Sequence, residues 1–294
     1  MNRYSTTCRN QYSKRKATIP QNSTLAHLLV SNRYKTLFCY VPKVACSNWK
    51  RIFLVFNGHF TTVDEIERTQ AHESPLLDKL IKYREEEIRH KLETYKKIIF
   101  VRDPLERVVS AYRNKFAFDY QKKFHHLYGI SIIKKYRKNL TREVTDEDHA
   151  TFNEFVKYLV DLRPTHFRNE HWSEQYKLCS LCDINYDFIG RFESLEADAV
   201  RALEFMGASK VVTFPKLEKR PEGQETKSTL EKFYSQISKN EFASLTKMYE
   251  IDYELFGYHK PSYSEVVNGL WMALSSHAYL SQSEHTAKSQ IWAL

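Results

Sequence analysis

A short apolar run, a polar turn and an amphipathic helical pattern follow one another twice in this sequence. The first unit has its apolar run at residues 37–41 and its helical pattern at 47–56. The second has its apolar run at 97–101 and its helical pattern from Pro104 to residue 116. A short apolar run bounded by turn residues is typical of a buried strand, and proline is favoured at the first position of a helix. The chain is therefore constrained to contain two strand–turn–helix units.

The rest of the chain continues this alternation of strands and helices. A third strand is predicted at residues 186–191. The helical patterns between and after the strands cover residues 76–92, 120–138, 152–160, 195–206 and 229–249. Such alternation is typical of an α/β protein whose parallel sheet is flanked by helices on both faces. We predict one α/β domain at residues 35–263, preceded by a basic arm at 1–34 and followed by a peripheral or disordered tail at 264–294.

Glycine is scarce in this chain, and its scarcity excludes the commonest nucleotide-binding loops. Only 7 glycines are present, and none falls into the pattern GxGxxG or the pattern GxxxxGK followed by Ser or Thr. A kinase with a glycine-rich phosphate loop is therefore excluded. Any phosphate site in this protein has to be built from a loop of another composition.

Polar residues follow both predicted strands, at the edge of the sheet where α/β proteins bind ligands. After the first strand, residues 42–51 combine the free amide groups of a helix start with Lys43 and with Ser47, a good N-cap residue. After the second strand come Arg102, whose guanidinium can bind a phosphate through two hydrogen bonds, and Ser110 two helical turns later. The two turns therefore predict two phosphate or sulfate sites.

Positive charge is concentrated in the first part of the chain. Residues 1–63 contain ten Lys and Arg residues and no Asp or Glu, in a chain whose net charge is +9. Such an excess indicates an anionic partner, which is a nucleic acid, a membrane surface, a polyanionic sugar or a phosphate-bearing cofactor. The absence of helix-turn-helix, zinc-finger and RRM signatures argues against nucleic acid. A protein that only binds a polyanionic sugar would account for the charge, but not for two matched phosphate loops.

The cysteines and two sequons indicate the compartment. With five cysteines at least one is unpaired, and no second CxxC accompanies Cys179 and Cys182, so we expect no metal site. These two cysteines either form a short disulfide with each other or stay free. The sequons at Asn22 and Asn139 would accept glycans in the secretory pathway. Together these features favour an oxidising lumen, with one or two disulfides.

Two motifs carry a resemblance to a known family. The segments 41–51 (VPKVACSNWKR) and 101–116 (VRDPLERVVSAYRNKF) resemble the 5′-phosphosulfate and 3′-phosphate motifs of Golgi carbohydrate sulfotransferases. The resemblance is closest to the branch of chondroitin and dermatan 4-O-sulfotransferases, N-acetylgalactosamine 4-O-sulfotransferases and the HNK-1 sulfotransferase. It continues more loosely to about residue 263 through residues 169–172, 179–182 and 191–196. It implies a sulfotransferase fold with a P-loop-like sheet, and 3′-phosphoadenosine 5′-phosphosulfate (PAPS) as the sulfate donor.

The resemblance also implies roles for the residues of both motifs. Lys43 is expected to stabilise the leaving 5′-phosphate, and Arg102 and Ser110 are expected to bind the 3′-phosphate. The donor-binding residues of the first motif are Lys43, Val44, Ala45, Cys46, Ser47, Asn48 and Trp49. Within this set Cys46 is expected to pack as a small apolar residue and not to act as a nucleophile.

A histidine is expected to accept the proton of the acceptor hydroxyl, because imidazole suits proton transfer at neutral or slightly acidic pH. The resemblance favours His72, which lies between the two phosphate motifs as the matching histidine does in relatives. His171 is the alternative, with Glu170 either orienting it or acting as the base itself.

The expected function is transfer of sulfate to a sugar hydroxyl, O-4 of N-acetylgalactosamine in chondroitin or dermatan. Three alternatives stay open: terminal N-acetylgalactosamine of glycoproteins, glucuronic acid as in the HNK-1 epitope, and a glycosaminoglycan-binding protein without activity. Lys35, Lys50, Arg51 and, more weakly, the arm at 3–16 are the expected contacts of an anionic acceptor. The resemblance implies the Golgi lumen, with membrane attachment only through an anchor that these residues do not include.

Overall fold

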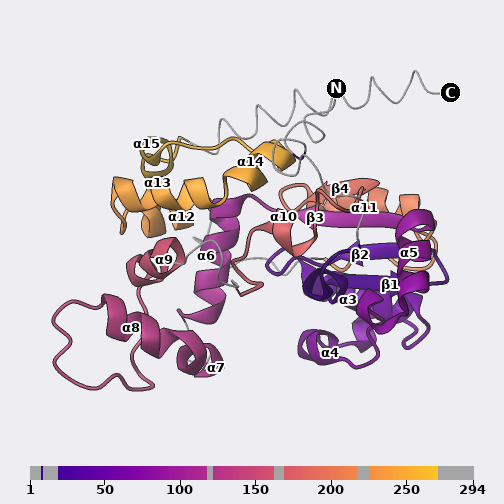
Figure 1. Cartoon of the computed structure of the whole chain (residues 1–294), viewed down its shortest axis with the longest axis horizontal. Coiled ribbons are helices and arrows are strands. Elements are labelled where there is room, and N and C mark those ends of the chain that lie inside the picture. The colour runs from indigo at the N-terminus through magenta and orange to yellow at the C-terminus, as the bar shows by residue number, and fades with distance from the viewer. Residues whose placement is uncertain (1–7, 9–18, 118–121, 162–168, 217–225, 271–294) are drawn as a thin grey trace. The chain divides into compact units, whose positions relative to one another are not determined.

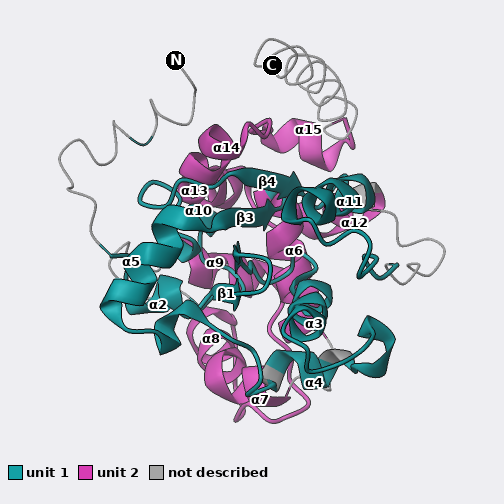
Figure 2. Ribbon diagram, turned by 90° about the vertical axis from the view of Figure 1, so that its right-hand side faces the viewer, with its two compact units in different colours: residues 1–103, 168–219 teal, residues 104–167, 220–294 magenta. Residues whose placement is uncertain are grey.

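The computed structural model describes residue 8 and residues 19–117, 122–161, 169–216 and 226–270. Residues 1–7 and 9–18 of the predicted arm, and the predicted tail beyond residue 270, lie outside the described residues. The chain divides into two compact units, which Figure 2 shows in teal and magenta. The first consists of residues 1–103 and 168–219, and the second of residues 104–167 and 220–294.

The first unit contains a four-stranded sheet (Figure 1). Its strands lie in the order β1 (Leu28–Ser31), β2 (Thr36–Cys39), β3 (Lys96–Val101) and β4 (Phe188–Arg191). Strands β2, β3 and β4 are parallel, and β1 is antiparallel to β2. The predicted α/β class and the three predicted strands are confirmed. Because the three parallel strands end at one edge of the sheet, the segments that follow them are brought together there.

Strand β1 lies inside the segment that the sequence assigns to the basic arm. Leu28, Leu29 and Val30 are fully buried in the sheet, and the short helix α2 (Asn22–Leu25) precedes them. Four residues are too few to display a clear period, which is why the pattern of side chains does not reveal this strand. The sheet therefore begins before residue 35, where the sequence places the start of the domain.

The first unit also contains several helices. They are α3 (Cys46–Phe56), α4 (Arg68–Glu73), α5 (Glu85–Thr94), α10 (Gln175–Leu178) and α11 (Leu195–Met206), with 3₁₀ turns η1 (Val63–Glu65) and η2 (Leu80–Lys82). Helix α3 contacts β1, and α11 contacts β4. The predicted helices at 47–56 and 195–206 are confirmed. The predicted helix at 76–92 is wrong in its first half, because α5 starts only at Glu85, where the Glu87 carboxylate accepts the backbone amide of Arg84 at 3.1 Å.

Aromatic side chains fill the space between α3 and the sheet. Trp49 on α3 is 0% exposed, and its ring centroid lies 4.8 Å from those of Phe38 on β2 and Phe100 on β3. Full burial of a large apolar side chain contributes about 1.5–3 kcal/mol to the free energy of folding. This packing fixes the first turn of α3 beside the end of β2.

The second unit contains helices and no strand in its described part. The helices are α6 (Pro104–Lys115), α7 (Lys122–Phe124), α8 (Ile130–Tyr136), α9 (Phe152–Asp161), α12 (Thr226–Tyr234), α13 (Lys239–Met248), α14 (Glu250–Phe256) and α15 (Tyr263–Val267), with a π-helical turn η4 (His125–Gly129) before α8. Tyr112 on α6 packs against Phe152 and Phe155 on α9, with ring centroids 5.2 and 5.8 Å apart. The predicted helices at 104–116 and 152–160 are confirmed.

Two long predicted helices of this unit are divided in the structure. The region 229–249 contains α12 and α13, because the Ser238 hydroxyl accepts the amide of Glu241 and caps a new helix. The region 120–138 contains α7, η4 and α8, with residues 120–121 outside the described part. Helix α15 occupies the first residues of the predicted tail. None of the described helices is both long enough and apolar enough to cross a membrane.

Two disulfide bonds link distant parts of the first unit. Cys39, the last residue of β2, is bonded to Cys179 at the end of α10, and Cys8 is bonded to Cys182. Both options predicted for Cys179 and Cys182 are therefore wrong, because each pairs with a cysteine 140 or 174 residues away. The prediction of one or two disulfides is confirmed, and Cys46 is free and buried.

We predict that the Cys39–Cys179 bond contributes about 2–4 kcal/mol to the free energy of unfolding, because it restricts the unfolded chain. Urea denaturation of Cys39→Ala/Cys179→Ala, followed by circular dichroism, should show this loss. In the Cys8→Ala/Cys182→Ala variant only the Cys39–Cys179 bond is left for a reductant to break. Reduction of this variant should therefore destabilise it by the same amount as Cys39→Ala/Cys179→Ala destabilises the wild type. A loss below about 0.5 kcal/mol, the size of an ordinary surface substitution, would contradict the prediction.

Candidate active site

The turn between β2 and α3 adopts the left-handed conformation at two residues that are not glycine. Lys43 has φ 72° and Ala45 has φ 53°. Such residues cost about 1–3 kcal/mol each and are found mainly at functional sites. Ala45 is the N-cap of α3, and no side chain caps this helix. The first amide groups of α3 are thus left for a ligand, and a helix start of this kind favours an anion.

Ser47 contacts the histidine that the sequence favours as base. The prediction of Ser47 as N-cap is wrong, since α3 begins one residue earlier and the left-handed Ala45 takes that position. The Ser47 hydroxyl instead lies 2.6 Å from Nε2 of His72, which comes from α4. On the other side of the ring, Nδ1 of His72 lies 3.5 Å from Nζ of Lys50. The fold therefore brings His72 to the phosphate turn.

Lys50 points into the protein. It is 5% exposed, and its ammonium lies 4.2 Å from the centroid of the Tyr40 ring. Burial lowers the pKa of Lys50, although its electrostatic interactions with Cys46 and Glu170 act in the opposite direction. Arg51 is likewise engaged, because its Nε donates to the carbonyl of Val63 at 2.9 Å. Neither Lys50 nor Arg51 provides the expected surface contact for an acceptor.

The charge of Lys50 decides which nitrogen of His72 carries the proton. An ammonium group can only donate, so a charged Lys50 requires Nδ1 of His72 to accept and leaves the proton of a neutral ring on Nε2. A neutral Lys50 can accept from Nδ1–H, and Nε2 then becomes the accepting nitrogen beside Ser47. Only the second arrangement allows Nε2 of His72 to take a proton.

Arg102 joins the two predicted phosphate turns. It is 4% exposed, its Nη1 donates to the carbonyl of Lys43 at 3.3 Å, and its guanidinium lies 4.1 Å from the Phe192 ring centroid. The buried side chain of Gln175 holds its backbone, accepting from the Arg102 amide at 3.0 Å and donating to its carbonyl at 2.8 Å. Glu193 accepts the amide of Asp103 at 2.7 Å. Sequence reasoning missed Gln175, because a single glutamine in a short helix carries no recognisable pattern.

The remaining predicted donor-binding residues lie in different environments. The side chains of Val44 and Trp49 belong to the buried core, and the amide of Asn48 donates to the carbonyl of Pro215 at 3.4 Å. These three side chains support the turn from inside, so a ligand would meet their backbone. Ser110 is half-buried on α6, in the second unit. No group of three or more potential metal ligands occurs in the part of the chain that the structure describes.

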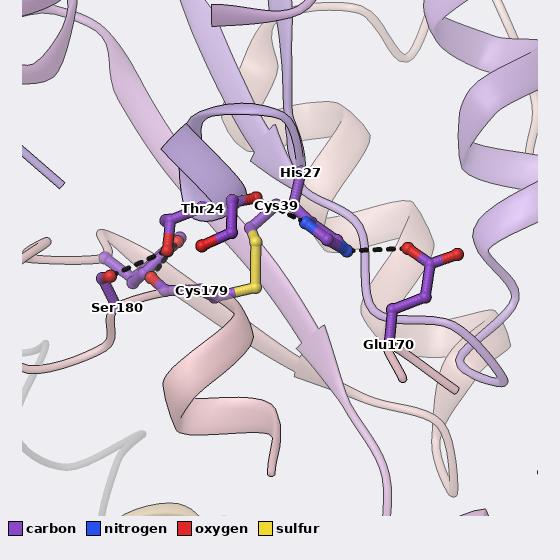
Figure 3. The surroundings of a disulfide bond; sticks show 8 residues. Thr24, His27, Cys39, Glu170, Cys179 and Ser180 are labelled. Carbon is purple, nitrogen blue, oxygen red and sulfur yellow. Dashed lines mark hydrogen bonds and ion pairs between the residues drawn. A yellow bond between two sulfur atoms is a disulfide. The ribbon is translucent and has the colours of Figure 1, made fainter. Parts of the chain in front are cut away.

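Glu170 is paired with a histidine that the sequence did not single out. Its Oε2 lies 2.8 Å from Nε2 of His27, whose Nδ1 lies 2.8 Å from the carbonyl of Ser23 (Figure 3). Each ring nitrogen of His27 therefore faces an oxygen that accepts hydrogen bonds, a carbonyl on one side and a carboxylate on the other. Burial alone would raise the pKa of Glu170, but His27 outweighs it and lowers the pKa to about 2. Such a carboxylate is too weak a base for the role of proton acceptor.

His171 is held by the side chain of Asn169. The oxygen of Asn169 accepts both the backbone amide of His171 at 3.0 Å and the proton on its Nδ1 at 2.7 Å. When the ring is neutral, this contact leaves Nε2 without a proton. His171 therefore has the tautomer that a base requires, and it reaches this state without Glu170 as an orienting partner.

The lowered pKa of Glu170 predicts a pH-dependent contribution to stability. Its folded pKa lies below the unfolded value of about 4.3, so the stabilisation is complete above that value and is lost as the pH falls toward 2. Glu170→Gln should therefore reduce the free energy of unfolding at pH 7, by about 1 kcal/mol or less because the side chain is partly exposed. The difference from the wild type should be smaller at pH 4. A difference that grows on acidification would refute the ion pair.

The chain is similar to known proteins along most of its length. The sequence profile of the sulfotransferase family matches residues 26–259. Carbohydrate sulfotransferase 11 of Mus musculus is 41% identical over 264 residues, which are 87% of this chain and 74% of the relative. Carbohydrate sulfotransferase 14 of Mus musculus is 42% identical over 246 residues, covering 82% of this chain and 62% of the relative. Carbohydrate sulfotransferase 8 of Homo sapiens is 36% identical over 252 residues, covering 85% of this chain and 59% of the relative.

No solved structure matches the chain significantly. The family profile nevertheless covers most of the chain, and the relatives align along most of its length. The predicted resemblance is confirmed. The chain belongs to the sulfotransferase family, and it is an enzyme of the carbohydrate sulfotransferase group.

Proposed function

We propose that this enzyme transfers the sulfuryl group of PAPS to a sugar hydroxyl, O-4 of N-acetylgalactosamine in chondroitin or dermatan. The observation that carries the proposal is the uncapped start of α3, reached through a left-handed turn to which Arg102 is hydrogen-bonded. The choice of acceptor rests on the resemblance of residues 41–51 and 101–116 to the 4-O-sulfotransferase branch. Membership of the family removes the alternative of a binding protein without activity.

The residues of the first turn suit an anionic donor. Residues 42–51 include two lysines, an arginine, one hydroxyl and one amide side chain and the uncapped start of a helix, and they include no carboxylate. The amides of Cys46 and Ser47 would hold the 5′-phosphosulfate together with Lys43. Arg102, through its guanidinium, and Ser110 would hold the 3′-phosphate.

The proposed chemistry needs charge stabilisation and a base from the protein. When bound, PAPS supplies a sulfuryl group, whose bond to the 5′-phosphate oxygen breaks as a bond to the acceptor oxygen forms. Lys43 places positive charge where the leaving phosphate gains negative charge. His72 accepts the hydroxyl proton on Nε2, in the form of the ring that a neutral Lys50 supports. The contact between His72 and Ser47 supports this choice, because it places the imidazole on the donor turn.

The Golgi lumen is the proposed compartment. Both disulfides need an oxidising environment, and glutathione keeps cysteines reduced in the cytosol. The asparagines of both sequons, Asn22 and Asn139, are exposed, as N-glycosylation requires. The proposed protein is a luminal glycoprotein, attached to the membrane through an anchor outside these residues as in the branch that it resembles.

Lys43→Ala should abolish transfer while preserving the fold. Removal of one preorganised donor from a site of charge development lowers the rate about 10²–10³-fold. Incorporation of labelled sulfate from PAPS into chondroitin measures the loss, and disaccharide analysis identifies the position. Lys210→Ala is a control, because Lys210 is an exposed lysine of the same unit that follows α11 and has no proposed role in donor or acceptor binding. Near-normal turnover by a folded Lys43→Ala enzyme would contradict the role of Lys43 at the leaving phosphate. If the wild-type enzyme sulfates only the terminal sugars of glycoproteins, the proposed acceptor is wrong.

Single-turnover transfer at saturating PAPS and acceptor should identify the base. We expect His72→Ala to lose transfer but to retain PAPS binding, while Glu170→Gln keeps most of its rate because its carboxylate is committed to His27. Wild-type activity should fall on the acid side as the imidazole becomes charged. If His72→Ala keeps the wild-type rate and His171→Ala loses it, the role belongs to His171, whose tautomer is also suitable.

A further inference from the structure

The first unit contains an open pocket of about 600 Å³ away from the phosphate turns. It is formed by the turn between β1 and β2, the end of α3 and residues 75–82. Helix α3 starts at the phosphate turn and ends at this pocket, and its 11 residues span about 16 Å at 1.5 Å per residue. The pocket therefore lies at the edge of the sheet opposite to the candidate active site.

Positive charge predominates in this pocket. Arg33 is exposed in the β1–β2 turn and makes no ion pair with any described residue. Lys82 donates to the carbonyls of Pro75 and Leu77 at 3.1 and 2.8 Å, which leaves its positive charge uncompensated. The single carboxylate of the lining, Asp78, accepts a hydrogen bond from the Tyr83 hydroxyl.

The remaining walls combine apolar and polar surfaces. Leu76 lines the pocket and is 45% exposed, and Phe56 at the end of α3 also lines it but is only 1% exposed. The exposed ring of His59 adds a polar group that can donate or accept. Apolar walls with a few well-placed polar groups are typical of small-molecule sites, and a sugar ring offers matching apolar faces and hydroxyl edges.

We propose that this pocket is a second binding site for the acceptor, which holds an acidic sugar of the same chain at a distance from the sugar that receives sulfate. The inference rests on the proposed function, in which the acceptor is an anionic polysaccharide. Arg33 and Lys82 pair with the carboxylate or sulfate of the bound sugar, and the exposed side chain of Leu76 contacts its ring. Only an acceptor long enough to reach both sites gains from the second contact, because that contact acts through effective concentration.

Charge reversal of Arg33 tests this proposal. In Arg33→Glu, the apparent KM for polymeric chondroitin should rise about fivefold or more, with kcat unchanged, because a favourable charge is replaced by a repulsive one. The KM for a chondroitin tetrasaccharide should not change. The matched control is Lys210→Glu, a reversal at an exposed lysine that follows α11 in the same unit. An unchanged KM for the polymer, or equal increases in both variants, would overturn the proposal.

Binding without turnover separates this proposal from the proposed function. Calorimetry of desulfated chondroitin polymer in the absence of PAPS should show weaker binding to Arg33→Glu than to the wild type or Lys210→Glu. The difference should shrink with added salt, since exposed charges are screened within about 8 Å at physiological ionic strength. If this difference is found but the enzyme transfers no sulfate to chondroitin, the pocket is supported as a polysaccharide-binding site and the proposed sulfation of chondroitin is contradicted. Equal binding by all three proteins overturns the pocket, whatever the enzyme sulfates.

Discussion

The disulfide between Cys39 and Cys179 is the constraint on which the candidate site depends. It fastens the segment 169–182 to the end of β2, four residues before Lys43. The same segment holds Arg102 through Gln175 and pairs with His27 through Glu170 (Figure 3). Both phosphate turns are therefore positioned by one covalently attached segment, although neither turn belongs to it.

The strained turn before α3 needs this support. Lys43 and Ala45 adopt a backbone conformation that glycine would adopt without cost, and the chain has no glycine here. The strain, about 1–3 kcal/mol per residue, is offset by the burial of Trp49 on one side and by the bond from Arg102 to the Lys43 carbonyl on the other. In return the turn leaves the first amides of α3 without a capping side chain.

Local features of the sequence predict the framework of this site, whereas its long-range pairs cannot be predicted in the same way. The strand–turn–helix units at 37–56 and 97–116 follow from apolar runs and helical periods within about twenty residues. His27 and Glu170 are 143 residues apart, and Arg102 and Gln175 are 73 apart, so no local pattern connects them. The exact start of α3 was also missed, because Ser47 has the better capping side chain and the left-handed Ala45 overrides it.

The composition of residues 1–63 suggests one basic surface, but the fold places their positively charged side chains in two different locations. Lys50 and Arg51 turn inward, where Lys50 contacts His72 and Arg51 holds the Val63 carbonyl. Arg33 remains outside, at the opposite end of α3. Under the proposed function, charges beside the turn before α3 would act on the donor and on the base, while a distant charge would attract the acceptor. This separation keeps an anionic acceptor from competing with the donor for the same cations, since surface charges about 16 Å apart interact only weakly through physiological salt.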